Sequence, residues 1–121
     1  MKKYVLIVSH GSREESANRE FKRIVRGYQK RHSSWKVELA YLDLVSPSIP
    51  QALETLAAKS NEILVLPYFL FSARHVKKDI PEIIKTFQKK YPRVKVKMAK
   101  PFGSDPKLLA ILDKRVREVT N

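Results

Sequence analysis

The sequence predicts an α/β protein with a small parallel sheet of about four strands and helices on both faces, in the order βαβαβαβα. Short apolar runs alternate with longer stretches in which apolar residues recur at helical spacing. The first run, residues 3–9, is almost continuously apolar, as expected of a strand buried on both faces. At 121 residues, the chain is expected to form one domain over residues 1–121 with a substantial core.

The first half of the chain is expected to contain two strands and two helices. A helix over residues 15–31 is predicted by an apolar stripe, which consists of Ala17, Phe21, Ile24, Val25 and Tyr28. Residues 35–42 form the second predicted strand. The loop at residues 46–50 leads into the second helix, where Pro50 fits the first turn.

The second half repeats this alternation. Residues 62–66 form a third predicted strand, and we expect Asp79 to cap the helix that follows. Residues 94–98 alternate apolar side chains with lysines, which predicts a half-exposed strand at a sheet edge. Asp105 and Pro106 are expected to cap a last helix.

Composition limits the possible partners and locations. Lys and Arg number 25 against 12 Asp and Glu, a net charge of +13, which attracts nucleic acid, phosphates or polycarboxylates. A lysine-rich solvated surface would give the same balance. The absence of cysteine excludes disulfides, thiolate metal sites and thiol catalysis. No apolar run approaches the ~20 residues of a membrane span, and no signal peptide is evident, so we expect a cytoplasmic protein without membrane contact.

Two of the three histidines directly follow predicted strands. His10 ends the first strand run, and His75 follows the third. The carboxyl ends of strands in an open parallel sheet are where ligands bind, and imidazole can hold a metal or move a proton near neutral pH. For His10 three alternatives stay open at this point: a locally bonded loop residue, an anion-binding turn with Gly11 and Ser12, and phosphohistidine chemistry. To His32 we assign no chemistry.

The loops after the second and third strands add further candidates. Asp43 is either a turn residue or a carboxylate that helps to bind a cation or take a proton. Two histidines and a carboxylate suit a labile divalent ion with open coordination positions, whereas a structural zinc has four closed ligands. Leu70 and Phe71 precede Arg74, so an apolar floor with a basic rim is expected there. Such a surface suits a planar ring that bears carboxylates.

Four stretches of the chain carry a family resemblance, namely VSHGSR (8–13), YLDLVSPSIP (41–50), LPYFLFSARHVKKDIP (66–81) and KPFG (100–103). In this order they resemble the class II tetrapyrrole chelatases, in particular the sirohydrochlorin ferrochelatases and cobaltochelatases. The resemblance implies a chelatase-like fold and an ion bound between His10 and His75. It also implies that His10 accepts pyrrole protons. Ser46 and the residues from Leu70 through Ser72, Ala73 and Arg74 to His75 would line the tetrapyrrole site.

The same resemblance implies the substrates and the assembly. The family often has glutamate at the position of Asp43, whose shorter side chain is expected to take part in proton handling. Arg13, Arg74, Lys77 and Lys78 are candidates to contact the substrate carboxylates. The divalent ion, Co²⁺ or Fe²⁺ with Ni²⁺ as a further candidate, would be a substrate, and no permanent cofactor is expected. The reaction would serve siroheme or cobalamin synthesis. Long family members contain two such units and short ones form homodimers, so this chain resembles either a short homodimeric member or half of a long one, with the N-terminal half of bacterial ferrochelatases as the nearest likeness.

A non-enzymatic nucleic-acid-binding domain is the alternative to this enzyme. The net charge of +13 alone is compatible with it. No nucleic-acid-binding motif is present, however, and few aromatic residues fall on predicted loops where they would stack on bases. We therefore expect no nucleic-acid partner.

Overall fold

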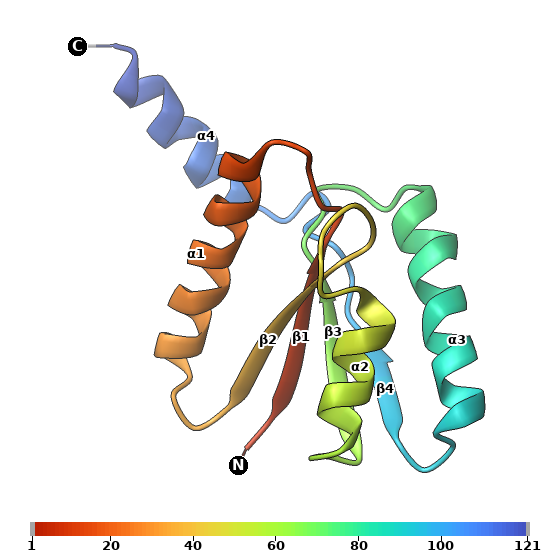
Figure 1. Cartoon of the computed structure of the whole chain (residues 1–121). Helices are drawn as coiled ribbons and strands as arrows, with labels where there is room; N and C mark the ends of the chain where they lie inside the picture. Colours follow the sequence, from red (N-terminus) through yellow and green to blue (C-terminus); the bar gives the residue numbers. More distant parts are fainter. Residues whose placement is uncertain (1, 121) are drawn as a thin grey trace.

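The computed structural model describes residues 2–120. The strands are β1 (Tyr4–Ser9), β2 (Lys36–Tyr41), β3 (Glu62–Pro67) and β4 (Lys95–Met98). The helices are α1 (Glu15–Arg31), α2 (Ile49–Ala57), α3 (Ile80–Lys90) and α4 (Lys107–Glu118), and a π-helical turn, η1 (His75–Asp79), leads into α3. All four strands are parallel, in the order β2-β1-β3-β4, which confirms the predicted α/β class (Figure 1).

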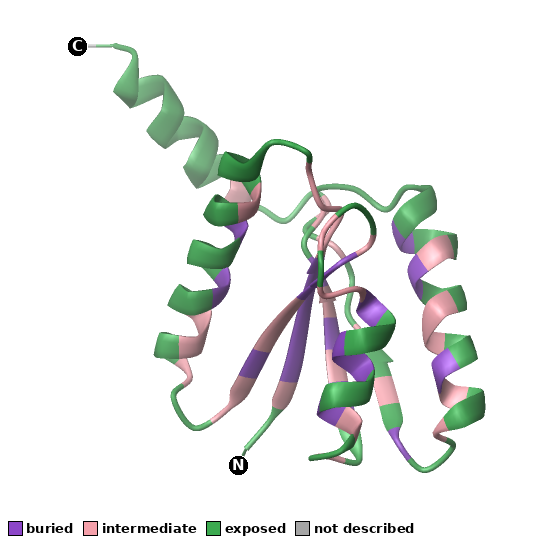
Figure 2. Ribbon diagram, in the orientation of Figure 1, coloured by how far each residue is buried: buried purple, intermediate pink, exposed green. Residues whose placement is uncertain are grey.

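Helices cover the two faces of the sheet unequally (Figure 1). Side chains alternate along β1, so Val5 and Ile7 pack with Phe21 of α1, whereas Leu6 and Val8 belong to the core under α2 and α3. The half-exposed strand predicted at residues 94–98 is β4, and it lies at an edge of the sheet as expected. In Figure 2, α4 is exposed along most of its length and has no buried residue.

The strand order creates a crevice at one end of the sheet. β1 and β3 are neighbours, but the helices that follow them, α1 and α3, lie on opposite faces (Figure 1). The loops after these two strands therefore diverge, and such a switch point is where open α/β sheets bind their ligands. His10 directly follows β1, and His75 lies in the connection from β3 to α3.

The starts of the helices test the cap predictions. Ser48 and Gln51 form a capping box at α2, and Pro50 lies in the first turn as predicted. At α4 the N-cap position is Pro106, which makes no side-chain cap, and Asp105 Oδ1 just before it accepts a hydrogen bond from Lys107 N at 2.9 Å. The cap predicted at Asp79 is wrong, because the helical backbone already begins at His75 and Asp79 makes no capping bond. None of the helices within residues 2–120 is long and apolar enough to cross a membrane.

Tyr41 contains a buried hydroxyl without a hydrogen-bond partner among the described residues. Burial raises the pKa of Tyr41 above its ordinary value of 10.0, because the phenolate would lose its hydration. We expect Tyr41→Phe to raise the free energy of unfolding by up to about 1 kcal/mol, since an unsatisfied buried group is removed. Urea denaturation at pH 7 measures this effect.

The pH dependence of the free energy of unfolding tests the effect of Tyr41→Phe in a second way. A raised folded-state pKa means that the stability contributed by the neutral phenol is fully present below pH 10.0 and is lost as the pH rises above it. The advantage of Tyr41→Phe should therefore grow above about pH 10. Tyr91→Phe is the control, because the Tyr91 hydroxyl is bonded to Glu54 Oε1 at 3.1 Å and its removal should not stabilise the protein. An unchanged difference between pH 7 and pH 11 would contradict the prediction.

Candidate functional site

The two strand-end histidines lie side by side in the crevice between the β1 and β3 loops. The ring centroids of His10 and His75 are 4.8 Å apart, with an angle of 68° between the ring planes. They are separated by more than sixty positions in the sequence, and the parallel pairing of β1 with β3 brings them together. Two imidazoles at this separation can share one ion.

The hydrogen bonds of the two rings leave the same nitrogen free in each. His10 Nδ1 lies 3.0 Å from the Gly11 carbonyl oxygen, and His75 Nδ1 lies 2.8 Å from Asp79 Oδ2. A carbonyl oxygen can only accept, and so can an ionised carboxylate, so each neutral ring donates through Nδ1. Each Nε2 then holds an unshared electron pair. This is the tautomer that a metal-ligating or proton-accepting histidine requires.

The β1 loop is tied to the β2 loop beside it. The Asp43 backbone N–H donates to the His10 carbonyl oxygen at 2.9 Å, and Leu42 donates to Ser9 at the same distance. Gly11 has φ +92°, and a Cβ atom there would overlap the Asp43 carbonyl oxygen. Only glycine therefore fits this close approach without strain. The backbone that positions His10 depends on it.

The Asp43 carboxylate has a local role in the structure. It is exposed, and Oδ1 accepts a hydrogen bond from Leu44 N at 2.8 Å. Within residues 2–120, no group of three or more His, Asp or Glu side chains could hold a metal ion together. The structure thus brings His10 and His75 together, and it places Asp43 next to His10 through the backbone without adding its carboxylate to the pair.

Exposed apolar and basic side chains surround the histidines. Leu70 and Phe71 are 55% and 69% exposed, which is unusual for such large apolar side chains next to each other. The residues after them in the loop, Ser72, Ala73 and Arg74, are exposed as well. Arg13 and Ser46 are exposed on the β1 and β2 loops. Neither Arg13 nor Arg74 takes part in an ion pair in the described part of the chain, so both are available to an anionic ligand.

Two contributors to the site were not recognised from the sequence. Asp79 orients the His75 ring, and the i,i+4 spacing of the two residues on a helix is the sequence signal for this contact. Tyr68, the first residue after β3, lines with His10 a recess of about 370 Å³ on the α1 side. No sequence signal distinguishes Tyr68 from the core residues before it.

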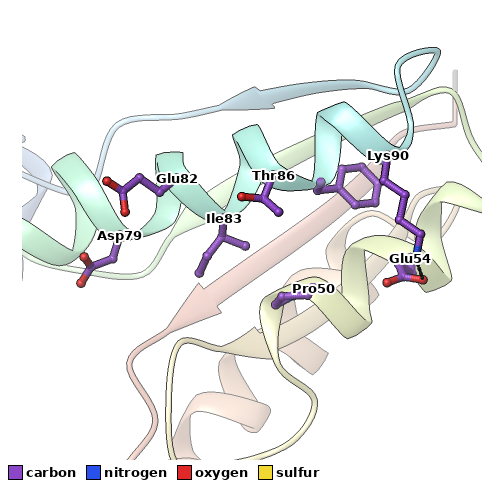
Figure 3. Close-up of a pocket in the computed structure, with 8 residues that line it drawn as sticks. Pro50, Glu54, Asp79, Glu82, Ile83, Thr86 and Lys90 are labelled. Atoms are coloured by element: carbon purple, nitrogen blue, oxygen red, sulfur yellow. Dashed lines mark ion pairs between the residues drawn. The ribbon is translucent and has the colours of Figure 1, made fainter.

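A second groove runs between α2 and α3 (Figure 3). Asp79 and Glu82 lie at one end, and the Glu54–Lys90 ion pair, with a separation of 3.6 Å, lies at the other. Three carboxylates on its walls would repel a polycarboxylate ligand. A polycarboxylate ligand is therefore not expected in this groove.

Comparison with known proteins gives one consistent result. The CbiX family matches residues 4–119. The chain is 32% identical over 120 residues to the sirohydrochlorin ferrochelatase of Bacillus subtilis (strain 168), covering 98% of this chain and 46% of that protein. It is also 32% identical over 126 residues to the sirohydrochlorin cobaltochelatase of Saccharolobus islandicus (strain L.S.2.15 / Lassen #1), covering 97% of this chain and 95% of that protein.

A solved structure shows the same fold. The sirohydrochlorin chelatase SirB from Bacillus subtilis subspecies spizizenii, in complex with cobalt, superposes with a TM-score of 0.89 at 32% identity, over 98% of this chain and 51% of that chain. The chain thus spans about half the length of SirB and of the Bacillus subtilis ferrochelatase. The match from residue 4 to residue 119 nevertheless includes every strand and helix described above, and the chain belongs to the CbiX family.

Proposed function

We propose that this chain inserts a divalent metal ion into sirohydrochlorin, as a metal chelatase. The observation that carries the proposal is the pair of adjacent imidazoles, His10 and His75, whose Nδ1 atoms are both engaged and whose Nε2 atoms are free. Relatives named for both iron and cobalt insertion support it. The nucleic-acid-binding alternative gains no support from any of these relatives.

The ring of the substrate would lie against the exposed Leu70 and Phe71. A planar macrocycle buries apolar surface there, while its carboxylates reach the basic rim. Arg13 and Arg74 can each form a bidentate pair with a carboxylate, and Lys77 and Lys78 provide mobile point charges. Ser46 would contact the edge of the ring from the β2 loop.

Insertion exchanges one divalent ion for two pyrrole protons. The ion would first bind Nε2 of His10 and of His75, and it would then pass to the ring nitrogens. When the ion leaves His10, the freed Nε2 electron pair can accept a pyrrole proton, so His10 acts as ligand and then as general base. Asp43, next to His10 and exposed, would pass a proton to solvent. The second pyrrole proton would leave through water.

The two-imidazole site does not select one ion by its chemistry. Imidazole accepts Co²⁺, Fe²⁺ and Ni²⁺, and selectivity often follows metal availability. Co²⁺ and Fe²⁺ are the proposed substrates because relatives are named for them, and Ni²⁺ stays a prediction. The product would enter siroheme or cobalamin synthesis. We propose that residues 1–121 act as one domain, paired with a second copy, and a cytoplasmic location stays a prediction.

Anaerobic mixing with sirohydrochlorin and each divalent ion tests the proposal directly. The visible spectrum should change to that of the metallated ring faster with the protein than without it. The assay should use ion concentrations low enough that spontaneous insertion is slow. Equal rates with and without the protein, for every ion, would refute the chelatase function.

Asp79→Asn should weaken binding of the ion without unfolding the protein. The neutral amide no longer stabilises the Nδ1 proton of His75 as a carboxylate does. Loss of a group that hydrogen-bonds a metal-binding histidine costs roughly ten- to a hundredfold in metal affinity. Isothermal titration with Co²⁺ measures the effect. Glu82→Gln is the matched control, since it removes the same charge from the same groove, whereas the hydrogen bond of His75 is made to Asp79. Equal losses in the two variants would mean that net charge, not orientation of His75, sets the affinity.

A further inference from the structure

The last helix, α4, presents an apolar stripe that nothing in the described chain covers. Ile111 of α4 is 47% exposed on another face of the helix. Four other exposed apolar residues, of which the last directly follows the helix, recur at intervals of three, four and three: Leu109 (62% exposed), Leu112 (61%), Val116 (58%) and Val119 (84%). This spacing places them on one face of the helix and is typical of a seam between packed helices. In Figures 1 and 2, α4 points away from the sheet, and none of its residues is buried.

A helix of this length is not stable by itself. Isolated helices shorter than about 12–15 residues are marginal in water, and most helical stability in proteins comes from packing an apolar face. α4 has 12 residues, and one bidentate ion pair, between Arg115 and Glu118, supports its last turn. We therefore expect another surface to cover its stripe in the working protein.

The body of the molecule has an uncovered apolar surface of its own. On the face that carries α1, Leu64 and Leu66 of β3 are only partly buried, because α1 packs over β1 and β2. Beside them is an apolar recess of about 220 Å³, lined by Ile7, Ile24, Tyr28, Leu66, Tyr68 and Phe102 together with Pro67. Ile24 and Phe102 are 46% and 41% exposed. A parallel sheet is normally covered by helices on both faces, and this surface is a part of the sheet that a helix would normally cover.

The connection between β4 and α4 directs the helix away from its own recess. Phe102 N–H donates to the Phe69 carbonyl at 2.9 Å, and Gly103 N–H donates to the Leu70 carbonyl, which fastens the connection to the rim. Asp105 then accepts the Lys107 N–H and starts the helix at once. For α4 to fill the recess of its own chain, these bonds would have to break. A second copy can supply its α4 without breaking them.

We propose that α4 of one copy packs its apolar stripe into the apolar recess of a second copy, and that the exchange is reciprocal. This inference rests on the homodimer of the proposed function and names its contact surface. One chain offers one helix and one recess, so a two-fold pair satisfies both and closes the assembly. The chain matches about half of SirB and nearly all of the Saccharolobus protein. Both matches agree with an apolar surface that contacts a second unit of this size.

The position of the contact relates it to the histidine site. Ile24 and Tyr68 line both the apolar recess and the recess next to His10. The helix of the second copy would therefore lie along the α1 side of the site. Arg74 lines neither of these two recesses.

Sedimentation velocity of the full chain and two variants tests the interface. Wild type should sediment as two copies, and Leu112→Glu should raise the dissociation constant by about thirtyfold or more, because a charge would enter an apolar contact. Ala110→Glu adds the same charge on the far side of α4 and should stay dimeric. Circular dichroism of the body should be unchanged in both. A monomeric wild type would overturn the dimer and this inference together, whereas a dimeric Leu112→Glu would overturn the interface alone.

Cross-linking identifies the partner surface. The chain has no cysteine, so Leu112→Cys and Ile24→Cys each introduce a single thiol. A short bismaleimide should join the two variants after they are mixed and allowed to exchange subunits, and it should join neither variant to itself efficiently. Self-joining of Leu112→Cys with no mixed product would show that two α4 helices pair with each other, which contradicts the exchange. Metal insertion is measured separately, so its failure leaves this test intact.

Discussion

His10→Ala should reduce metal insertion to the rate seen without protein. The substitution would remove a proposed ligand of the ion, which is also the proposed base for the first pyrrole proton. General base catalysis alone is worth about a hundred- to ten-thousandfold, so the loss should exceed a factor of about a hundred even at saturating ion. Initial rates at limiting Co²⁺, corrected for spontaneous insertion, measure the effect. Near-normal turnover of His10→Ala under these conditions would contradict the mechanism.

His75→Ala and His32→Ala make this prediction specific. His75 is proposed as a ligand only, so its loss should raise the ion concentration needed for half-maximal rate, and excess ion should restore part of the rate. Excess ion should not restore His10→Ala. His32 stacks on Trp35 with ring centroids 3.8 Å apart, away from the strand-end loops, and His32→Ala should insert metal normally. Equal rescue of His10→Ala and His75→Ala would show that the two histidines have the same role.

Gly11→Ala should both destabilise the protein and impair insertion. Gly11 has φ +92°, where an L side chain is strained, and the new Cβ would overlap the Asp43 carbonyl oxygen. Strain of this kind costs about 1–3 kcal/mol, and the overlap adds to it, so we expect a loss of at least about 2 kcal/mol in the free energy of unfolding. The movement that relieves the overlap separates the His10 and Asp43 loops. Urea denaturation and insertion rates measure the two effects.

Gly27→Ala is the matched control for this substitution. Gly27 lies inside α1, and an added Cβ would meet nothing within 4 Å. Alanine is the better helix former, so the same chemical change should stabilise the protein here by about 0.5–1 kcal/mol. Insertion should be unaffected. A stabilised or unchanged Gly11→Ala would mean that the His10 and Asp43 loops are not held in close contact.

Most of the fold could be predicted because its elements depend on local patterns. The apolar run of β1, the helical stripe of α1 and the alternation in β4 each reflect one periodicity, and periodicity survives in the sequence. The proximity of His10 and His75 also followed from a general rule, since the carboxyl ends of parallel strands meet at one edge.

The rest depends on contacts that no local pattern encodes. Asp79 has the composition and position of a cap, but its carboxylate bonds to His75 because the helical turn starts four residues earlier. The direction of α4 depends on hydrogen bonds from the β4 connection to the β3 loop, between residues about thirty positions apart. The helical stripe of α4 was visible in the sequence, but that its own chain leaves it uncovered was not.

The free Nε2 atoms of His10 and His75 are the centre of this account, and locating the bound ion tests them most directly. Crystals grown with Co²⁺ and without tetrapyrrole should show, in an anomalous difference map at the cobalt edge, one peak within bonding distance of both Nε2 atoms. The same map from the His10→Ala, His75→Ala double variant should lack this peak. A peak elsewhere with nothing between the histidines, or an unchanged peak in the double variant, would contradict the proposed site.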